Sequence, residues 1–227
     1  GKIAGIKIRI SRPIVGKLGL QPLFRAVEAG EALGLPVCVH TTDPPEEASS
    51  VAALLRPGDI YSHTYHGKGN TILNVDQSVQ QGILEAQKRG IFMEVGNGKV
   101  NFNFQIAEKA VAAGLWPDII SSDSTPATFH QSPTMWDLPF VMSKFLFLGM
   151  PFHKILRAVT VTPAQCLGLA DRIGKIALGY EADLILCRME NGRVSFEDAD
   201  GNCRIGDRQL KVQTTIQSGE IVFLSND

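Results

Sequence analysis

Residues 3–122 alternate between short apolar runs and longer stretches in which apolar residues recur at helical spacing. A strand is expected over residues 3–10, in which residues 6–10 alternate apolar and polar side chains as a half-buried strand does. Residues 21–33 place apolar side chains on one helical face, and Gly34 follows as a suitable C-cap. The same patterns predict strands at 37–39, 59–62, 91–95 and 118–122, and helices at 46–55, 76–88 and 104–113. Five strands separated by helices predict a parallel sheet with right-handed crossovers.

The pattern changes in the last third of the chain. A helical stretch is expected over residues 137–169. Short β-rich runs follow at 174–176, 182–187, 210–216 and 220–224. We therefore divide the chain into residues 1–173, which carry the strand–helix repeat, and residues 174–227, which belong to a small β-domain.

Two folds accommodate repeated strand–helix units: an open doubly wound sheet and a (β/α)8 barrel. No glycine-rich phosphate loop follows any of the predicted strands, which argues against a nucleotide-binding open sheet. In a barrel, active-site residues lie at the carboxyl ends of the strands. Polar residues occur at these ends here, so the barrel is favoured.

Four polar residues carry the candidate chemistry. His40, His63 and Asp123 each end a predicted strand, and Lys7 lies within the first one. Imidazole nitrogen and carboxylate oxygen suit zinc and similar divalent metals. Taken singly, each residue has an ordinary alternative: a hydrogen-bonded histidine, an aspartate that caps the next segment, and a lysine on the solvated face of an edge strand. Their recurrence at the same end of successive strands favours a shared metal site.

Composition and charge indicate which partners and which compartment the sequence favours. The net charge of −1 predicts no general attraction to nucleic acid or to an anionic membrane surface. No apolar run reaches the roughly 18 residues that a membrane helix needs. The four cysteines form no CxxC pair, and in a chain of this length they are interpreted as buried thiols of a cytoplasmic protein.

Several strings resemble the amidohydrolase superfamily, and most closely its dihydroorotase-like deacetylase branch. The strand around Lys7 resembles the carboxylated-lysine strand of that family. The segments ending at His40, His63 and Asp123 resemble its fifth, sixth and eighth strands. The string Gly179-Tyr180-Glu181-Ala182-Asp183-Leu184 resembles the entry into the second domain. The resemblance implies strands four to eight of a TIM-like (β/α)8 barrel, followed by part of a small β-sandwich domain.

The resemblance also implies a chemistry. Lys7 would carry a carbamate derived from CO2 and, with His40, His63 and Asp123, would hold one or two divalent ions, with zinc as the first expectation. A metal-bound hydroxide would attack an amide or ester carbonyl, and Asp123 would act as general acid and base. We expect an enzyme that deacetylates an N-acyl amino acid or a related acetylated acid. The alternatives are a dihydroorotase-like cyclic amidohydrolase and a metal-free scaffold without activity.

A small-molecule substrate would meet polar residues that lie near these ligands in the sequence. Those residues are Arg9, Ser11, Tyr65, His66, Lys68, Asn70 and Asn97. Each is equally well explained as a solvated loop residue. His153 is interpreted as a surface residue, and His130 keeps no assigned role.

Two departures from the family accompany the resemblance. The string Glu94-Val95-Gly96-Asn97-Gly98 stands where relatives show an aspartate and a His-Gly, and the His-x-His pair of the first barrel strand does not occur. The chain also opens within a predicted strand. We therefore expect an N-terminal segment of roughly 150 residues, in the same polypeptide or as a companion chain. The oligomeric state is open, and a homo-oligomer fits the sequence.

Overall fold

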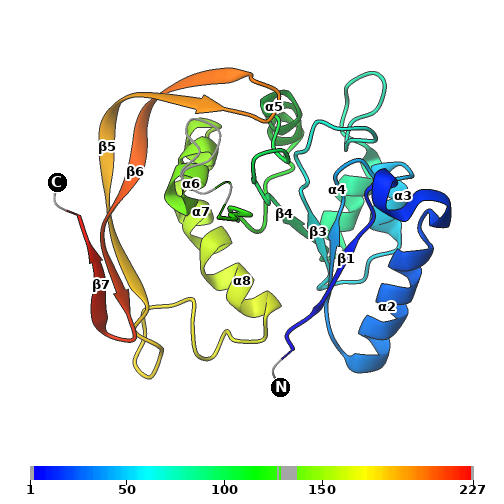
Figure 1. The fold of residues 1–227 in the computed structure, drawn as a ribbon. Helices are drawn as coiled ribbons and strands as arrows, with labels where there is room; N and C mark the ends of the chain where they lie inside the picture. Colours follow the sequence, from blue (N-terminus) through cyan, green and yellow to red (C-terminus); the bar gives the residue numbers. More distant parts are fainter. Residues whose placement is uncertain (1–2, 127, 129–136, 226–227) are drawn as a thin grey trace.

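The computed structural model describes residues 3–126, 128 and 137–225. Four short parallel strands form a sheet in the order in which they occur along the chain (Figure 1). They are β1 (Ile6–Arg9), β2 (Val37–His40), β3 (Ile60–Ser62) and β4 (Phe92–Glu94). The fifth predicted strand is reduced to one parallel bridge between Glu94 and Ile119. The order runs without reversal, whereas a doubly wound sheet reverses its order at the switch point.

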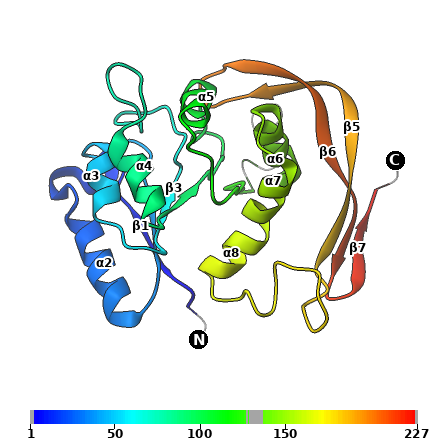
Figure 2. The same cartoon turned by 180° about the vertical axis from the view of Figure 1, so that it is seen from behind.

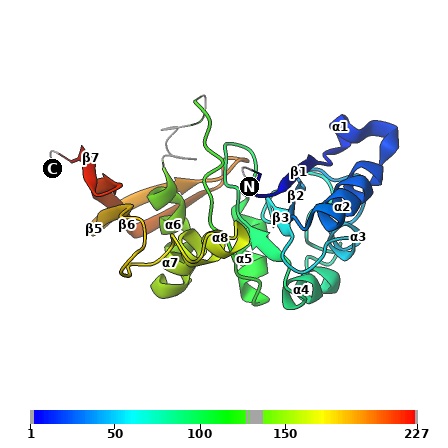
Figure 3. The ribbon, with the colours of Figure 1, turned by 90° about the horizontal axis from the view of Figure 1, so that it is seen from below.

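The helices that connect these strands follow one another along one side of the sheet, as α2 to α5 do in Figure 3. The connecting elements are α1 (Arg12–Val15), η1 (Gly16–Leu18), α2 (Gln21–Leu33), α3 (Ala48–Ala53), α4 (Gln81–Lys88) and α5 (Phe104–Ala112). Helix α2 has its predicted bounds. It ends at Gly34, whose φ of 63° is left-handed and costs glycine little.

The predicted helix at 76–88 begins five residues late, at Gln81. The cause is a local competitor for the backbone. The Asp76 carboxylate accepts hydrogen bonds from the backbone N–H and the hydroxyl of Ser78, which forms a turn in place of a first helical turn. Leu73 and Val79 then pair as an antiparallel bridge.

The strand register separates an apolar face from a polar one. Val37, Val39 and Tyr61 are fully buried. The residues next to them along each strand point to the opposite face of the sheet. On that face Lys7 is level with Cys38, and Arg9 is level with His40. The polar residues of the strands therefore share the face that is not covered by α2 to α5.

The chain after Asp137 forms three helices and a second sheet. The predicted helical stretch is divided into α6 (Leu138–Phe147), α7 (Phe152–Val159) and α8 (Val161–Cys166). Gly149 at φ 89° and Pro151 separate the first two helices, because neither continues a helix. The antiparallel sheet contains β5 (Leu184–Glu197), β6 (Cys203–Gln217) and β7 (Glu220–Leu224). It lies at the far end of the molecule from the parallel sheet, with α6 to α8 between them (Figure 1).

The predicted β-rich runs from residue 182 onward fall within this sheet, but residues 174–176 form no strand. Strands β5 and β6 are longer than the sequence suggests. Their pairing continues across a register shift between Asn191 and Val194, which accommodates the polar Asn191-Gly192-Arg193 segment.

Two further expectations concern the cysteines and a membrane-spanning helix. All four cysteines are free and none is buried, so the prediction of buried thiols is wrong. Cys38 and Cys166 are half-buried, whereas Cys187 and Cys203 are exposed. Both lie on the antiparallel sheet, which exposes many of its side chains to solvent. Among the helices of the described residues, none combines the length and apolarity needed to cross a membrane.

We expect Asp59→Ala to lower the free energy of unfolding by about 3 kcal/mol, because the change breaks a buried ion pair. Asp59 is 1% exposed and accepts hydrogen bonds from Val37 N and from the backbone and side chain of Arg56. Urea unfolding measures the loss. The control is Arg25→Ala, which breaks an exposed ion pair with Glu28 and should cost well under about 1 kcal/mol. Equal losses in the two variants would contradict the prediction.

Candidate metal centre at the strand ends

His40 ends β2 and offers a nitrogen that no protein group uses. Its side chain is buried, and Nε2 has no hydrogen-bond partner in the described structure. Burial, reinforced by the nearby His63 and Arg9, lowers the pKa of His40 to about 3. The ring is therefore neutral near pH 7. A buried polar atom without a partner is costly, and a bound cation would satisfy it.

His63 follows β3 directly and adopts a left-handed backbone with φ of 67°. A regular strand would alternate and direct His63 to the same side as the buried Tyr61. The left-handed turn instead accompanies a ring that lies 4.2 Å from the His40 ring, between centroids. His63 Nδ1 donates to Gly96 O at 2.8 Å, because a carbonyl oxygen only accepts. The proton on Nδ1 leaves a lone pair on Nε2, which suits metal ligation.

Asp123 is exposed and also has a left-handed backbone, with φ of 49°. Its Oδ2 accepts a hydrogen bond from Asn101 Nδ2 at 3.1 Å. Burial lowers the pKa of His63, and the negative charge of Asp123 opposes that effect, so the two groups interact. Left-handed backbone at a non-glycine residue is a local strain found at functional sites, and here Asp43, Gln77 and Ser218 share it with His63 and Asp123.

Lys7 lies on the same face as the histidines, and its side chain is exposed. Its Nζ is 3.4 Å from Cys38 Sγ. The positive charge of Lys7 contributes to lowering the pKa of both His40 and His63, which places it within electrostatic range of the pair. His40 and His63 thus lie together at the carboxyl ends of β2 and β3. Lys7 lies two residues before the end of β1, and Asp123 is close enough to His63 to influence its pKa.

The donor set fits a metal ion only in part. In the parts of the chain that the structure covers, no three His, Cys, Asp or Glu side chains are close enough to hold one ion. A lysine ammonium repels a cation, so Lys7 becomes a ligand only as a carbamate. The two imidazole nitrogens of His40 and His63 are the part of the set that is ready to bind.

Of the residues predicted to bind substrate, some are exposed cations and others are less exposed and hydrogen-bonded within the protein. Arg9 is exposed and donates to Ser11 Oγ at 3.3 Å, and Lys68 is exposed in the loop after β3. His66 is buried, with Nδ1 accepting from Lys68 N, and Asn70 donates to Pro44 O.

Tyr65 and Asn97 are fully buried and bonded within the protein. Tyr65 is fully buried, donates to Leu115 O and packs against the Phe145 ring, so it serves the core. Asn97 is also fully buried, and Lys144 donates to its Oδ1. His153 is exposed as expected, and His130 lies outside the described residues.

Sequence patterns alone miss two residues of the site. Glu94 ends β4 on the polar face, level with Ser62, and accepts a hydrogen bond from Ser121 Oγ at 2.7 Å. Its position at a strand end is the same signal that identifies His40. Asn101, which orients Asp123, carries no comparable signal because it lies in an irregular loop.

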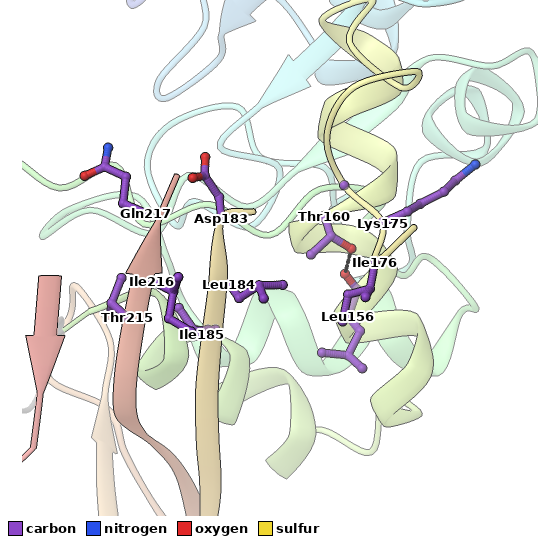
Figure 4. Close-up of a pocket in the computed structure, with 11 residues that line it drawn as sticks. Leu156, Thr160, Lys175, Ile176, Asp183, Leu184, Ile185, Thr215, Ile216 and Gln217 are labelled. Carbon is purple, nitrogen blue, oxygen red and sulfur yellow. Dashed lines mark hydrogen bonds between the residues drawn. The ribbon is translucent and has the colours of Figure 1, made fainter. Parts of the chain in front are cut away.

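A separate pocket of about 700 Å³ lies between α7–α8 and the start of the antiparallel sheet (Figure 4). Aliphatic side chains such as Leu156, Ile176, Leu184 and Ile216 line it, and Thr160 Oγ1 donates to Leu156 O at 2.6 Å. Its lining includes none of the predicted ligands, and its few charged groups, Lys175 and Asp183, do not form a catalytic cluster. The pocket is therefore not the candidate active site.

We expect Gly96→Ala to weaken zinc binding about tenfold or more, the usual scale for disturbing a group that orients a ligand. Gly96 has φ of 51°, and a Cβ there would lie 2.4 Å from His63 Nδ1. Competition with a chelating dye measures the affinity. Gly114→Ala is the control, because Gly114 has φ of 85° with no heavy atom within 4 Å of the added Cβ. If both variants bind zinc as the parent does, His63 is not held as a ligand by Gly96.

Comparison with known proteins shows which family the chain resembles. The family model described as Amidohydrolase family matches residues 23–222. A deacetylase of Brucella anthropi is 29% identical over 223 residues, which is 98% of this chain and 55% of that protein. A crystal structure of an adenine deaminase superposes with a TM-score of 0.92 at 28% identity, over 98% of this chain and 60% of the other. For a dihydroorotase structure the TM-score is 0.86 at 29% identity, over 98% and 57%.

The chain spans about half the length of the curated relatives that it matches. The family match nevertheless extends from α2 to β7 and includes His40, His63 and Asp123. This chain belongs to the amidohydrolase family.

Proposed function

We propose that this chain carries metal ligands and an acid–base residue of an enzyme that hydrolyses the C–N bond of an N-acyl amino acid or a related acetylated acid. The observation that carries the proposal is the pair of imidazoles at the ends of β2 and β3. His40 Nε2 is buried without a partner, and the hydrogen bond from His63 to Gly96 leaves His63 Nε2 as a lone-pair donor. The similar deacetylase supports deacetylation as the reaction.

The fold that we propose is a (β/α)8 barrel in which β1 to β4 and the segment at Ile119 are strands four to eight. The sequential parallel order and the row of helices along one side support it. The superposition on the adenine deaminase and dihydroorotase structures points the same way. Residues 1–173 would form the barrel part, and residues 174–227 part of a small β-sandwich domain.

The proposed ligands are His40, His63, Asp123 and Lys7 as its carbamate, with zinc as the first candidate. A bound divalent ion would lower the pKa of water and polarise the scissile carbonyl. The chain's own residues supply the rest. Asp123 is exposed at the strand ends and held by Asn101, so it is placed to accept a proton from water and to deliver it to the leaving nitrogen.

The two exposed cations near the site suit an acidic substrate. Arg9 lies level with His40 on the same face, and Lys68 follows His66 in the adjacent loop. Either side chain offers charge-assisted hydrogen bonds to a carboxylate. A substrate that carries a carboxylate beside its acylated nitrogen would use both the metal ligands and one of these cations.

A dihydroorotase-like cyclic amidohydrolase is the second candidate, because a dihydroorotase structure superposes closely on this chain. Its substrate would carry a ring amide and a carboxylate, which the same cations would bind. A metal-free scaffold is the third candidate, and metal analysis of the purified protein distinguishes it from both enzymes.

A substrate panel tests the proposal. The protein is assayed with zinc or manganese and bicarbonate on N-acetyl and N-formyl amino acids of both chiralities, with dihydroorotate and adenine alongside. We expect turnover of an acylated amino acid. Turnover of dihydroorotate alone would favour the cyclic amidohydrolase. A protein that binds no metal and turns over nothing would favour the scaffold.

A further inference from the structure

A lysine is completely buried behind the candidate site. Lys144 lies on α6 with no exposed side chain, and its Nζ is 5.0 Å from the centre of the Phe102 ring and 5.6 Å from that of Phe140. Burial lowers the pKa of Lys144 to about 7, while Asp198 and Glu197 act in the opposite direction. A buried cation costs several kcal/mol unless its partners are well placed. Its position in the core therefore calls for a specific role.

Lys144 joins two segments that are far apart in the sequence. Its Nζ donates to Asn97 Oδ1 at 3.1 Å and to Glu197 O at 3.0 Å. Asn97 belongs to residues 95–103, which we call the β4–α5 loop, and Glu197 is the last residue of β5. The lysine thus connects the tip of the β5–β6 hairpin to a loop at the carboxyl end of the parallel sheet.

A chain of hydrogen bonds links Asn97, in the β4–α5 loop, to the proposed acid–base residue Asp123. Asn97 N donates to Ser121 O, and Asn101 N donates to Asn97 O. Asn101 Nδ2 then donates to Asp123 Oδ2. The loop backbone also lies close to the carboxylate, because a Cβ on Gly98 would be 2.8 Å from Asp123 Oδ2. The position of Asp123 is therefore tied to the position of Asn97.

The hairpin tip fixes the far end of the same loop. In Figures 1 and 2 the hairpin arches over α6 and its tip reaches α5. Asp198 Oδ2 accepts from Phe104 N at 2.8 Å, Ala199 N donates to Phe102 O, and Asn103 Nδ2 donates to Asp200 Oδ2. Lys144 joins this tip to the start of the loop through Glu197 O and Asn97 Oδ1.

We propose that Lys144 is a positioning residue: through Asn97 it fixes the β4–α5 loop, and through Asn101 that loop orients Asp123. The inference rests on the proposed function for its catalytic part, because Asp123 must act on the substrate. The fixing of the loop does not depend on the reaction. The two parts can therefore be measured separately.

The test replaces Lys144 with methionine, which keeps an unbranched apolar stem and removes the donor. We expect amide hydrogen exchange in residues 95–103 to become about tenfold faster or more, since the loop opens locally once its contact is lost. On the substrate found by the panel, kcat should fall about tenfold or more with KM within about twofold, because an interaction that orients a reacting group affects the transition state rather than binding. A purely structural lysine would instead change the melting temperature and leave the kcat-to-KM pattern unchanged.

The matched control is Arg204→Met, which breaks the ion pair with Glu108 at the same hairpin without touching the loop. It should leave exchange in residues 95–103 and kcat unchanged. If Lys144→Met does not fold, Asn97→Ala removes the same contact and carries the same two measurements. When both single variants fold, their double variant should be no slower than the slower single one, since the residues act in one chain of contacts.

The outcomes separate the two proposals. Unchanged loop exchange and unchanged kcat in Lys144→Met would overturn the inference, whatever the enzyme hydrolyses. Faster exchange in a protein that turns over no member of the panel would support the fixing of the loop while the proposed function fails. Faster exchange with unchanged kcat would overturn the link to Asp123.

Discussion

Asp123→Asn should lower kcat by about a hundredfold or more while the protein remains folded, the usual scale for a positioned acid–base group. Asparagine keeps the shape of the side chain and an oxygen for Asn101, but it cannot accept the water proton. The exposed carboxylate has Asn101 as its hydrogen-bond donor in the described structure and influences the His63 pKa. Steady-state kinetics on the substrate of the parent protein measures the change.

The control for this variant is Asp207→Asn, which removes a carboxylate that is 96% exposed on the antiparallel sheet. It should keep the kcat of the parent. Metal content must be measured for both proteins, because Asp123 is also a proposed ligand. Near-normal turnover in Asp123→Asn with a normal metal content would show that another group moves the proton.

Lys7→Ala should lose bound metal and activity together. Alanine removes the nitrogen that forms the carbamate and leaves only imidazole and carboxylate ligands, which do not form a group of three in the described structure. Added bicarbonate should restore nothing. A short-chain carboxylic acid should restore part of both, because its two oxygens can occupy the place of the carbamate.

The modification itself can be observed directly. The protein prepared with metal and ¹³C-bicarbonate should show a carbamate carbon signal, and Lys7→Ala should not. Lys17→Ala, at an exposed lysine of η1, serves as the control and should keep the signal. If Lys7→Ala binds metal as the parent does, Lys7 is an ordinary solvated lysine beside Cys38.

The elements that local patterns specify are predicted well from the sequence. Helix α2 has an apolar face and a glycine C-cap, and its bounds agree with the prediction. The strands of the parallel sheet fall where short apolar runs occur. Strands β1, β3 and β4 are shorter than predicted, and β2 is one residue longer. The prediction fails where a side chain competes for the backbone, as Asp76 does before α4, and where one helical pattern is divided by Gly149 and Pro151.

The candidate site shows the same division between local and long-range information. The sequence places His40 and His63 at strand ends, and the structure brings their rings together. It does not predict that Asn101 would hold Asp123. Lys144 lies in an apolar run that predicts packing, and spacing alone cannot distinguish a buried lysine from an exposed one. Its partners, Asn97 and Glu197, are 47 and 53 residues away.

The left-handed backbone at His63 and Asp123 has a consequence for how this protein can change over evolutionary time. A left-handed conformation costs an L-residue roughly 1 kcal/mol or more that glycine does not incur. Selection for stability alone would therefore favour glycine at both positions, whereas glycine offers neither a ring nitrogen nor a carboxylate. Under the proposed function, stability and catalysis are opposed at these two residues, and a lineage that no longer needed the reaction would lose them without a penalty in folding.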